Sequence, residues 1–161
     1  MPRILTDDSN YPFYTVDGAV GRNAPNDRLD VLLVQFLMFL CTKDNREGPL
    51  PQLSVPRGLR VATPIAGAKT VTPTHPRPQG NIVIDGFCGN ETIGFIEYFQ
   101  ELMKLRGVGT ELNGQVAPAR HLPWGTTIYW LNTYGTTYVT RPWKLRESDA
   151  FPQELKNSFY L

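Results

Sequence analysis

Residues 84–92, IDGFCGNET, decide the fold expected for this chain, because they form a tight turn that leads directly into an amphipathic helix. Asp85-Gly86 is typical of a turn, since glycine reaches positive φ without steric cost and an aspartate side chain can bond the backbone two residues on. A helix is favoured next, because Asn90 is a suitable N-cap and Glu91 follows where the helix dipole favours an acid. The expected structural turn motif comprises Asp85, Gly86, Gly89, Asn90 and Thr92.

The helix that follows this turn is predicted from its apolar spacing. Residues 95, 96, 99, 102 and 103 are apolar and recur at helical intervals. Arg106-Gly107 then supplies a basic last turn and a C-cap glycine, so the helix is expected to end there.

The pattern Asp-Gly-x-x-Gly-x-x-Thr, followed by a helix that contains Phe-Gln, resembles the peptidoglycan-binding domain family of small helical cell-wall modules. Residues 20–26 (VGRNAPN) and 30–37 (DVLLVQFL) are similar to the first helix of a peptidoglycan-binding-like subfamily. Residues 113–118 (NGQVAP) and 127–132 (TIYWLN) are similar to its last loop and third helix. The resemblance implies a mainly α fold, a three-helix peptidoglycan-binding-like bundle over residues 20–133, and binding of a glycan or a stem peptide.

The remaining segments have no counterpart in this family. A Pro-rich insert at 42–83 interrupts the domain, and it excludes a long helix because half of the chain's 14 prolines lie within it. We predict a hairpin from runs 60–63 and 69–72, which makes this a small β-containing insert. The termini are predicted as extensions: 1–19, expected to be irregular, and 134–161.

Two further expectations concern the C-terminal extension. Gly135 is expected to end the third helix, and residues 136–140 (TTYVT) are predicted to form a strand. Residues 149–159 are predicted to form a short terminal helix with Pro152 near its start. Residues 16–21 (VDGAVG) are similar to residues 84–89 (IDGFCG), which we interpret as two similar turns rather than a repeat.

The first helix, expected from the Asn26 cap to about Cys41, is apolar nearly all round. Val31, Val34 and Met38 point away from the face that carries Leu29, Leu33, Phe36 and Leu40. A helix of this kind is buried. Either the insert and the tail cover it, or a second subunit does, which predicts a homo-oligomer or a larger assembly.

Composition excludes several classes of function. A net charge of +1 argues against nucleic acid as a partner. The densest apolar stretch, residues 31–41, is about half of what a bilayer needs and is interrupted by Gln35, so no membrane span is expected. The first residues lack the pattern of a signal peptide. We therefore expect synthesis in the cytoplasm, and action at the cell wall or within a particle after export or release.

Neither a metal nor a catalytic group is predicted. His75 and His121 stand in separate loops without zinc-like spacing, and no cofactor motif is present. Cys41 and Cys88 are expected to be buried thiols rather than a disulfide. Glu97 and Glu101, with Glu91 and Asp85, are the acids to weigh for a muramidase, but paired acids on a helix are usually solvated. The chain is interpreted as a non-enzyme.

Aromatic side chains are the candidates for ligand binding, because sugar rings stack their C–H faces on Trp or Tyr. They cluster around the third helix, and since Tyr129 and Trp130 are adjacent, at least one is expected to pack inward. The predicted ligand-binding residues are Trp124, Tyr129, Trp130 and Tyr98.

Two functions remain open from the sequence. The first is a non-catalytic peptidoglycan-binding module, of the kind a phage, lysis or secretion system uses to dock on the wall. The second is a structural subunit of a virion or contractile injection assembly that reuses the same fold. The second rests on the apolar first helix, the Pro-rich arm, the extended termini and the lack of a secretion signal.

Overall fold

The computed structural model describes residues 1–7, 12–43, 74–76, 78–79, 82–105, 107–119, 125–137, 142–147 and 149–159. In this part of the chain, four α-helices, one 3-10 helix and two small antiparallel sheets make a mixed, α-rich fold. In chain order, the elements are β1 (Arg3–Thr6), β2 (Pro12–Thr15), β3 (Val20–Gly21), α1 (Arg28–Lys43), α2 (Asn90–Leu105), β4 (Gln115–Val116), α3 (Thr127–Thr137), the 3-10 helix η1 (Pro142–Glu147) and α4 (Gln153–Ser158).

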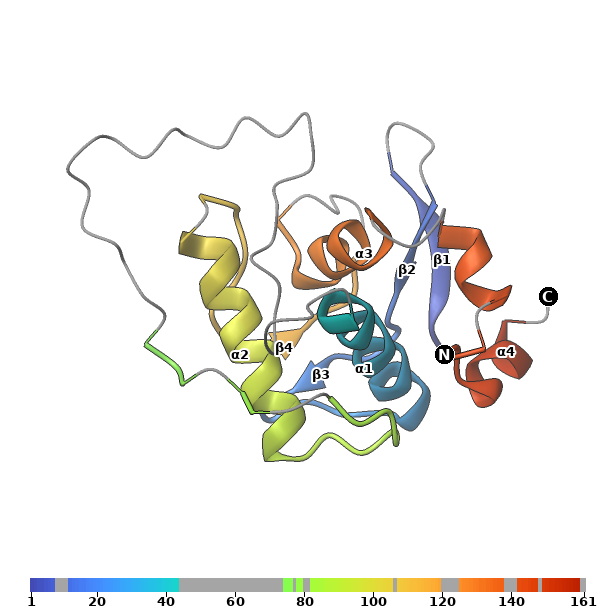
Figure 1. The fold of residues 1–161 in the computed structure, drawn as a ribbon, viewed down its shortest axis with the longest axis horizontal. Helices are drawn as coiled ribbons and strands as arrows, with labels where there is room; N and C mark the ends of the chain where they lie inside the picture. Colours follow the sequence, from blue (N-terminus) through green and yellow to red (C-terminus); the bar gives the residue numbers. More distant parts are fainter. Residues whose placement is uncertain are drawn as a thin grey trace.

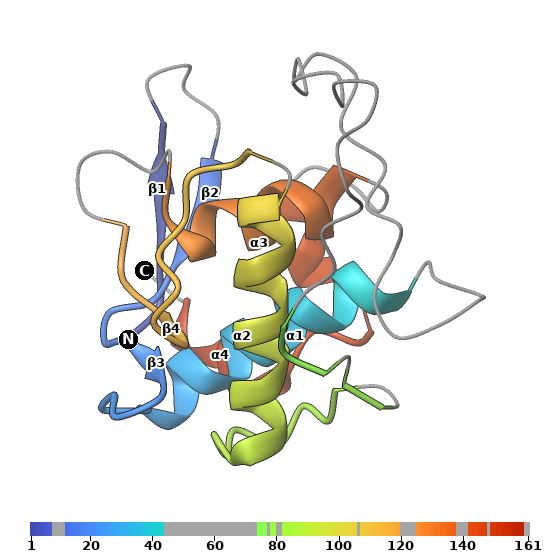
Figure 2. The ribbon, with the colours of Figure 1, turned by 90° about the vertical axis from the view of Figure 1, so that its left-hand side faces the viewer.

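Helices α1 and α3 pack against each other at the centre of the molecule. Helix α2 lies on one side of this pair, and the β1–β2 hairpin and α4 lie on the other (Figures 1 and 2). Strands β3 and β4, which pair Val20 with Val116, lie beside α2. The expected three-helix bundle is therefore not confirmed, because strands and a fourth helix also contribute to the core.

The cap of helix α1 lies one residue later than predicted. The N–H of Val31 donates to the carbonyl of Asp27 at 2.9 Å, whereas Asn26 precedes the helix with a φ of 57°. The Asn26 side chain instead holds the preceding loop, accepting from the Gly21 N–H at 2.7 Å and donating to the Ala24 carbonyl at 2.9 Å. The prediction of Asn26 as N-cap was wrong, since its amide closes a local turn.

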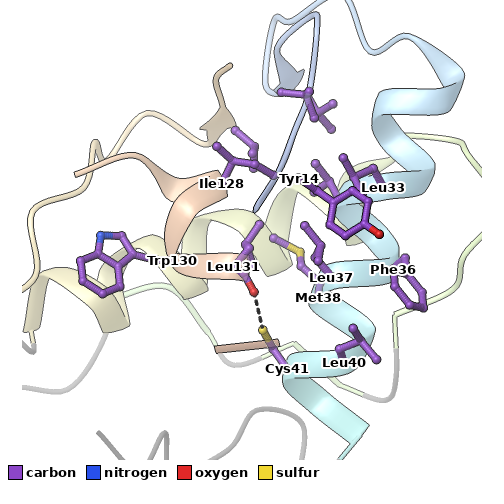
Figure 3. Close-up of a cluster of buried hydrophobic side chains, with 14 of the residues drawn as sticks. Tyr14, Leu33, Phe36, Leu37, Met38, Leu40, Cys41, Ile128, Trp130 and Leu131 are labelled. Carbon is purple, nitrogen blue, oxygen red and sulfur yellow. Dashed lines mark hydrogen bonds between the residues drawn. The ribbon is translucent and has the colours of Figure 1, made fainter. Parts of the chain in front are cut away.

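The chain itself covers α1. Val31, Val34 and Met38, the residues that suggested a second subunit, are no more than 1% exposed. Figure 3 shows side chains of α3 and β2 packed against α1, with the Cys41 Sγ 3.7 Å from the carbonyl oxygen of Leu131. The side chains of α1 that are buried in this core are Val31, Leu32, Leu33, Val34, Phe36, Leu37, Met38, Leu40 and Cys41.

The two termini complete this core rather than extend from it. Tyr14 in β2 is fully buried, and its N–H and C=O bond the Asn132 side chain of α3 at 2.8 and 2.7 Å. At the other end of the chain, the Phe151 ring meets Phe36 of α1 edge-on, with centroids 4.9 Å apart. Leu155 of α4 is also fully buried. The predicted irregular segment 1–19 thus contains two strands, and the expectation of extended termini was wrong.

Other boundaries also differ from the predictions. Gly135 does not end α3, which continues to Thr137, so residues 136 and 137 are helical rather than strand. The terminal helix is shorter than expected, and Pro152 immediately precedes it. The predicted hairpin at 60–63 and 69–72, and residues 138–140, lie outside the described residues.

Helix α2 follows the prediction closely. The N–H of Ile93 donates to the carbonyl of Gly89 at 3.0 Å, so Gly89 caps the helix and Asn90 is its first residue rather than its cap. At the other end, Gly107 has a φ of 73°, and the Val108 N–H bonds the Met103 carbonyl at 3.0 Å. This is the left-handed glycine cap that the sequence indicated.

Candidate functional site

The Asp85-Gly86 turn is held by one buried amide of α1. The Gln35 Oε1 accepts the N–H groups of Asp85 and Gly86 at 3.1 and 2.8 Å. Its Nε2 donates to the Asp85 carboxylate at 2.9 Å and to the Thr92 hydroxyl at 3.2 Å. The Asp85 carboxylate also accepts the Phe87 N–H at 2.9 Å, and these bonds lower its pKa. The predicted Asx turn is confirmed, and Gln35 anchors it to the core.

A second turn, before α3, has the same construction. Gln100 of α2 is fully buried, and its Oε1 accepts the Gly114 N–H at 2.9 Å. Its Nε2 donates to the Gln115 carbonyl at 2.7 Å and to the Thr127 hydroxyl at 2.9 Å. The Asn113 side chain accepts the Gln115 N–H at 2.9 Å, as Asp85 does at its own turn.

The two turns are structural equivalents. In each, a buried glutamine from one helix binds an Asx-Gly turn and a threonine in the first turn of the following helix. The Asp17-Gly18 turn is different, because the buried carboxylate of Asp30 accepts its two N–H groups at 3.0 and 2.8 Å. The counterpart of the Asp85 turn is therefore the Asn113 turn and not the Asp17 turn.

A cavity of about 200 Å³ lies beside the second turn. Gly114 forms part of its wall with a φ of 66°, and a Cβ there would lie 2.9 Å from an oxygen of Glu97. Only glycine allows this carboxylate to approach the turn so closely. The cavity is lined by Arg22, His75, Glu97, Gln100, Glu101, Leu112, Asn113 and Gly114.

Glu97 is one of the two acids in this cavity, and its side chain is only 14% exposed. Its Oε1 accepts two N–H groups from the Arg22 guanidinium, at 2.8 Å from Nε and 2.6 Å from Nη2. Arg22 follows β3 directly, so the β3–β4 pairing places this cation over α2. Charge-assisted bonds of this kind are about twice as strong as neutral ones and fix the carboxylate in place.

Glu101 is the second acid, one helical turn further along α2, and its side chain is 13% exposed. It accepts hydrogen bonds from the Thr74 hydroxyl, from the His75 N–H at 2.9 Å and from the His75 ring Nδ1 at 2.9 Å. Burial alone would raise the pKa of Glu101, but these bonds outweigh it and lower the pKa to about 2. Glu101 is therefore an ionised carboxylate across the neutral range.

The sequence analysis considered these two acids for catalysis and set them aside, so it did not predict them as lining a site. Their spacing places them together on one face of α2, which predicts a solvated pair. The structure instead buries most of both side chains under Arg22 and residues 74–75. The α2 spacing was the usable signal, but nothing in the sequence indicates that β3 and the end of the Pro-rich segment lie over that face.

Three of the four predicted aromatic ligand residues, Tyr98, Tyr129 and Trp130, are described by the structure, and none of them lines the cavity. Tyr129 and Trp130 belong to the core, with 7% and 6% of their surfaces exposed, and the Trp130 Nε1 donates to the Gly109 carbonyl at 3.2 Å. This agrees with the expectation that at least one of them packs inward. Tyr98 is half-buried on α2, and Trp124 lies outside the described residues.

Both cysteines are free, as expected. Cys41 is buried, and burial raises the pKa of its thiol to about 12, whereas Cys88 is half-buried. In the described ranges, no group of three His, Cys, Asp or Glu residues is arranged to hold a metal ion. Over the same ranges, every helix is too short or too polar to cross a bilayer.

Comparisons with protein-family models, with curated proteins and with solved structures found no match for this chain. The resemblance to peptidoglycan-binding domains therefore rests on the sequence motifs alone.

Proposed function

We propose that this protein is a non-catalytic peptidoglycan-binding module whose ligand-binding site is the cavity beside the Asn113-Gly114 turn. The observation that carries the proposal is the pair Glu97 and Glu101, two largely buried carboxylates in the wall of an open cavity. Burial of charged groups is costly unless they are paired, and here Arg22 and His75 pair the two acids in the lining of a cavity. The turn beside them is also the segment that resembles the last loop of the family.

The size of the cavity favours the stem peptide over the glycan as the group that enters. Pockets for drug-sized ligands are roughly 300–1,000 Å³, and this cavity is about 200 Å³. A single side chain fits this volume better than a disaccharide does. The lining is also polar and charged, with Leu112 as its apolar contribution, whereas a sugar platform uses aromatic faces.

A binding role also fits the surroundings of the two acids better than catalysis does. A glycosidase needs one carboxylic acid that holds a proton at neutral pH. The pKa of Glu101 is about 2, and Glu97 receives two N–H groups from a guanidinium. Both carboxylates are therefore placed to hold cations and donors rather than to deliver a proton.

Retention on purified sacculi tests this function. Leu112→Glu replaces the apolar part of the cavity lining with a third carboxylate, and this residue is 49% exposed, so the fold should tolerate the change. The matched control is Leu105→Glu, at a leucine that is 41% exposed and lies outside the cavity. We expect the wild type and the Leu105 variant to be retained and the Leu112 variant to be lost. A wild-type chain that passes sacculi unretained would refute the wall-binding proposal.

The non-catalytic part has a separate readout. Wild-type protein incubated with sacculi should release no soluble muropeptides. Release that disappears in Glu97→Gln would instead identify a hydrolase that uses this cavity.

The structural-subunit alternative loses one of the observations that suggested it, the apolar surface of α1, because the described part of the chain covers this helix. The native mass of the purified chain addresses it directly. A monomer agrees with the binding module, and a defined oligomer would favour the subunit.

A further inference from the structure

The chain contains three Asx-Gly dipeptides, which are Asp17-Gly18, Asp85-Gly86 and Asn113-Gly114. Glycine has no Cβ to keep its backbone nitrogen away from the preceding side chain, so this nitrogen can reach the side-chain carbonyl carbon and close a five-membered ring. Asparagine is a thermolabile residue, whereas an ionised aspartate reacts slowly because its carboxylate is a poor electrophile. Asn113-Gly114 is therefore the dipeptide with the highest intrinsic reactivity.

The structure holds the glycine nitrogen of each dipeptide on a buried side chain of α1 or α2. The bonded pairs are Gly18 with Asp30 at 2.8 Å, Gly86 with Gln35 at 2.8 Å and Gly114 with Gln100 at 2.9 Å. The three accepting side chains are no more than 1% exposed. A nitrogen that donates to such an acceptor must break this bond before it can lose its proton and turn toward the preceding side chain.

The side chain of Asn113 is fixed as well. Its Oδ1 accepts the Gln115 N–H at 2.9 Å, and its Nδ2 donates to the Glu111 carboxylate at 2.7 Å. Gly114 completes the turn with a φ of 66°. Both ends of the amide are engaged, so the amide carbon cannot rotate toward the Gly114 nitrogen unless these bonds break.

Asp17 and Asp85 are less reactive for a further reason. Hydrogen bonds, chiefly from the terminal amino group to Asp17 and from the Phe87 N–H to Asp85, lower the pKa of both carboxyls. Both side chains are therefore carboxylates at neutral pH. Of the three dipeptides, Asn113-Gly114 depends most on the acceptor that holds its glycine.

We infer that Asn113 is a latent deamidation site that Gln100 keeps closed in the folded protein. Once the Gln100 bond opens, the Gly114 nitrogen gives its proton to solvent and attacks the Asn113 Cγ. The new N–Cγ bond forms as the Cγ–Nδ2 bond breaks, and the side-chain nitrogen takes up a proton and leaves as ammonia. Water then opens the ring at either carbonyl, which yields aspartate or isoaspartate without any other reactant. This inference does not depend on the proposed ligand.

Deamidation changes the wall of the cavity. An aspartate at this position can still accept the hydrogen bond that closes the turn, as Asp85 does in the first turn. Its second oxygen, however, would replace the donor that Glu111 now receives, and would place two like charges at hydrogen-bond distance. Isoaspartate adds a methylene to the main chain, so the turn cannot close in the same way. Because Asn113 lines the cavity, either product adds a negative charge beside Glu97 and Glu101.

Mass spectrometry of aged protein tests the inference. The folded wild-type chain and a synthetic peptide of residues 110–118 are incubated in the same mildly alkaline buffer, and the deamidated fraction at Asn113 is followed over time. We expect the folded chain to react at least about tenfold more slowly than the peptide, because the reaction needs the turn to open. Equal rates would overturn the inference, and so would a peptide in which Asn113 stays intact.

Hydrogen exchange connects this slowing to the Gln100 bond without any substitution. Exchange of the Gly114 N–H in the wild-type protein, measured by NMR, reports how often this bond opens. The factor by which the fold slows deamidation should equal or exceed the factor by which it slows this exchange, since both need the same opening. A protected Gly114 N–H beside an Asn113 that reacts at the peptide rate would show that the bond is no barrier.

Substitutions assign the protection to the accepting oxygen. Gln100→Leu removes this oxygen, so deamidation of the folded variant should approach the peptide rate, whereas Gln100→Glu keeps an oxygen for the Gly114 N–H and should stay slow. Gln35→Leu is the matched control, because it removes the equivalent acceptor at the other turn and leaves Asn113 held. Equal rates in the two leucine variants would overturn the role of Gln100. If Gln100→Leu does not fold, the exchange comparison in the wild type decides.

Discussion

Replacing Gly86 with alanine should lower the free energy of unfolding by about 2–3 kcal/mol. Gly86 has a φ of 74°, a conformation that costs an L residue roughly 1–2 kcal/mol. A Cβ would also lie 2.8 Å from the Arg28 Nη1 and 3.0 Å from its Cγ. Arg28 would have to move, which breaks its 2.7 Å bond to the Asp85 carbonyl, worth about 0.5–1.5 kcal/mol. The solvent-exposed ion pair between Arg28 and Glu154 contributes little to the stability of the fold.

Two other glycines separate these contributions. Gly107 has a φ of 73°, and no atom of the described chain lies within 4 Å of the position that a Cβ would take. Gly107→Ala should therefore cost only the backbone strain, about 1–2 kcal/mol. Gly94 lies within α2 with equally open surroundings in the described residues, so Gly94→Ala should stabilise the protein by about 0.5–1 kcal/mol. In an Arg28→Ala background, Gly86→Ala should cost no more than Gly107→Ala.

Urea unfolding followed by far-UV circular dichroism gives these values, provided that the m-value is unchanged. Gly86→Val, with a β-branched side chain, should be worse than Gly86→Ala. A Gly86→Ala protein as stable as the wild type would show that this turn does not need its positive φ. A cost equal to that of Gly107→Ala in the wild-type background would show that the Arg28 contact contributes nothing.

Three further outcomes are expected. Gln35→Leu should destabilise the protein by about 3 kcal/mol, because two turn N–H groups lose their acceptor, whereas the exposed Gln153→Leu should change little in the same unfolding assay. In the folded protein at mildly alkaline pH, iodoacetamide should leave Cys41 unmodified, since the pKa of its thiol is about 12. Peptide mass spectrometry should show that Cys41 reacts when the protein is alkylated in denaturant. The folded pKa of Glu101, about 2, lies below its ordinary value of 4.5. The ionised carboxylate therefore contributes its full stabilisation of the folded protein above about pH 4.5, and this contribution is lost as the pH falls toward 2. The difference in unfolding free energy between the wild type and Glu101→Gln, measured by urea unfolding, should shrink over this pH range.

Local sequence signals predicted the parts of the fold that local interactions determine. The Asp85-Gly86 turn, the start of α2 near Asn90 and its end at Gly107 depend on φ preferences and caps within a few residues. A one-residue error remained at the start, because Gly89 and Asn90 are both acceptable caps. The Asn26 error has a different origin, since the same residue type that caps helices also closes turns, and only the loop from Gly21 decides between them.

Contacts between residues that are far apart in the sequence could not be predicted from such local signals. Tyr14 and Asn132 are 118 positions apart, and no pattern in either segment indicates the other. The apolar surface of α1 correctly requires a cover, but it leaves open whether the chain or a second subunit provides it. The candidate cavity depends on Arg22 and Glu97, 75 positions apart, so the acids alone suggest a solvated surface.

The Asn132 side chain also has a consequence for the solution behaviour of the protein. By accepting the N–H of Tyr14 and donating to its C=O, this amide takes the place of a neighbouring strand along the edge of β2 that β1 does not occupy. Because Tyr14 is fully buried and α3 packs against β2, no other chain can reach this edge in the folded protein. Asn132→Leu would remove the partner that this amide provides to both backbone groups while they stay buried, so its main effect should be a loss of stability.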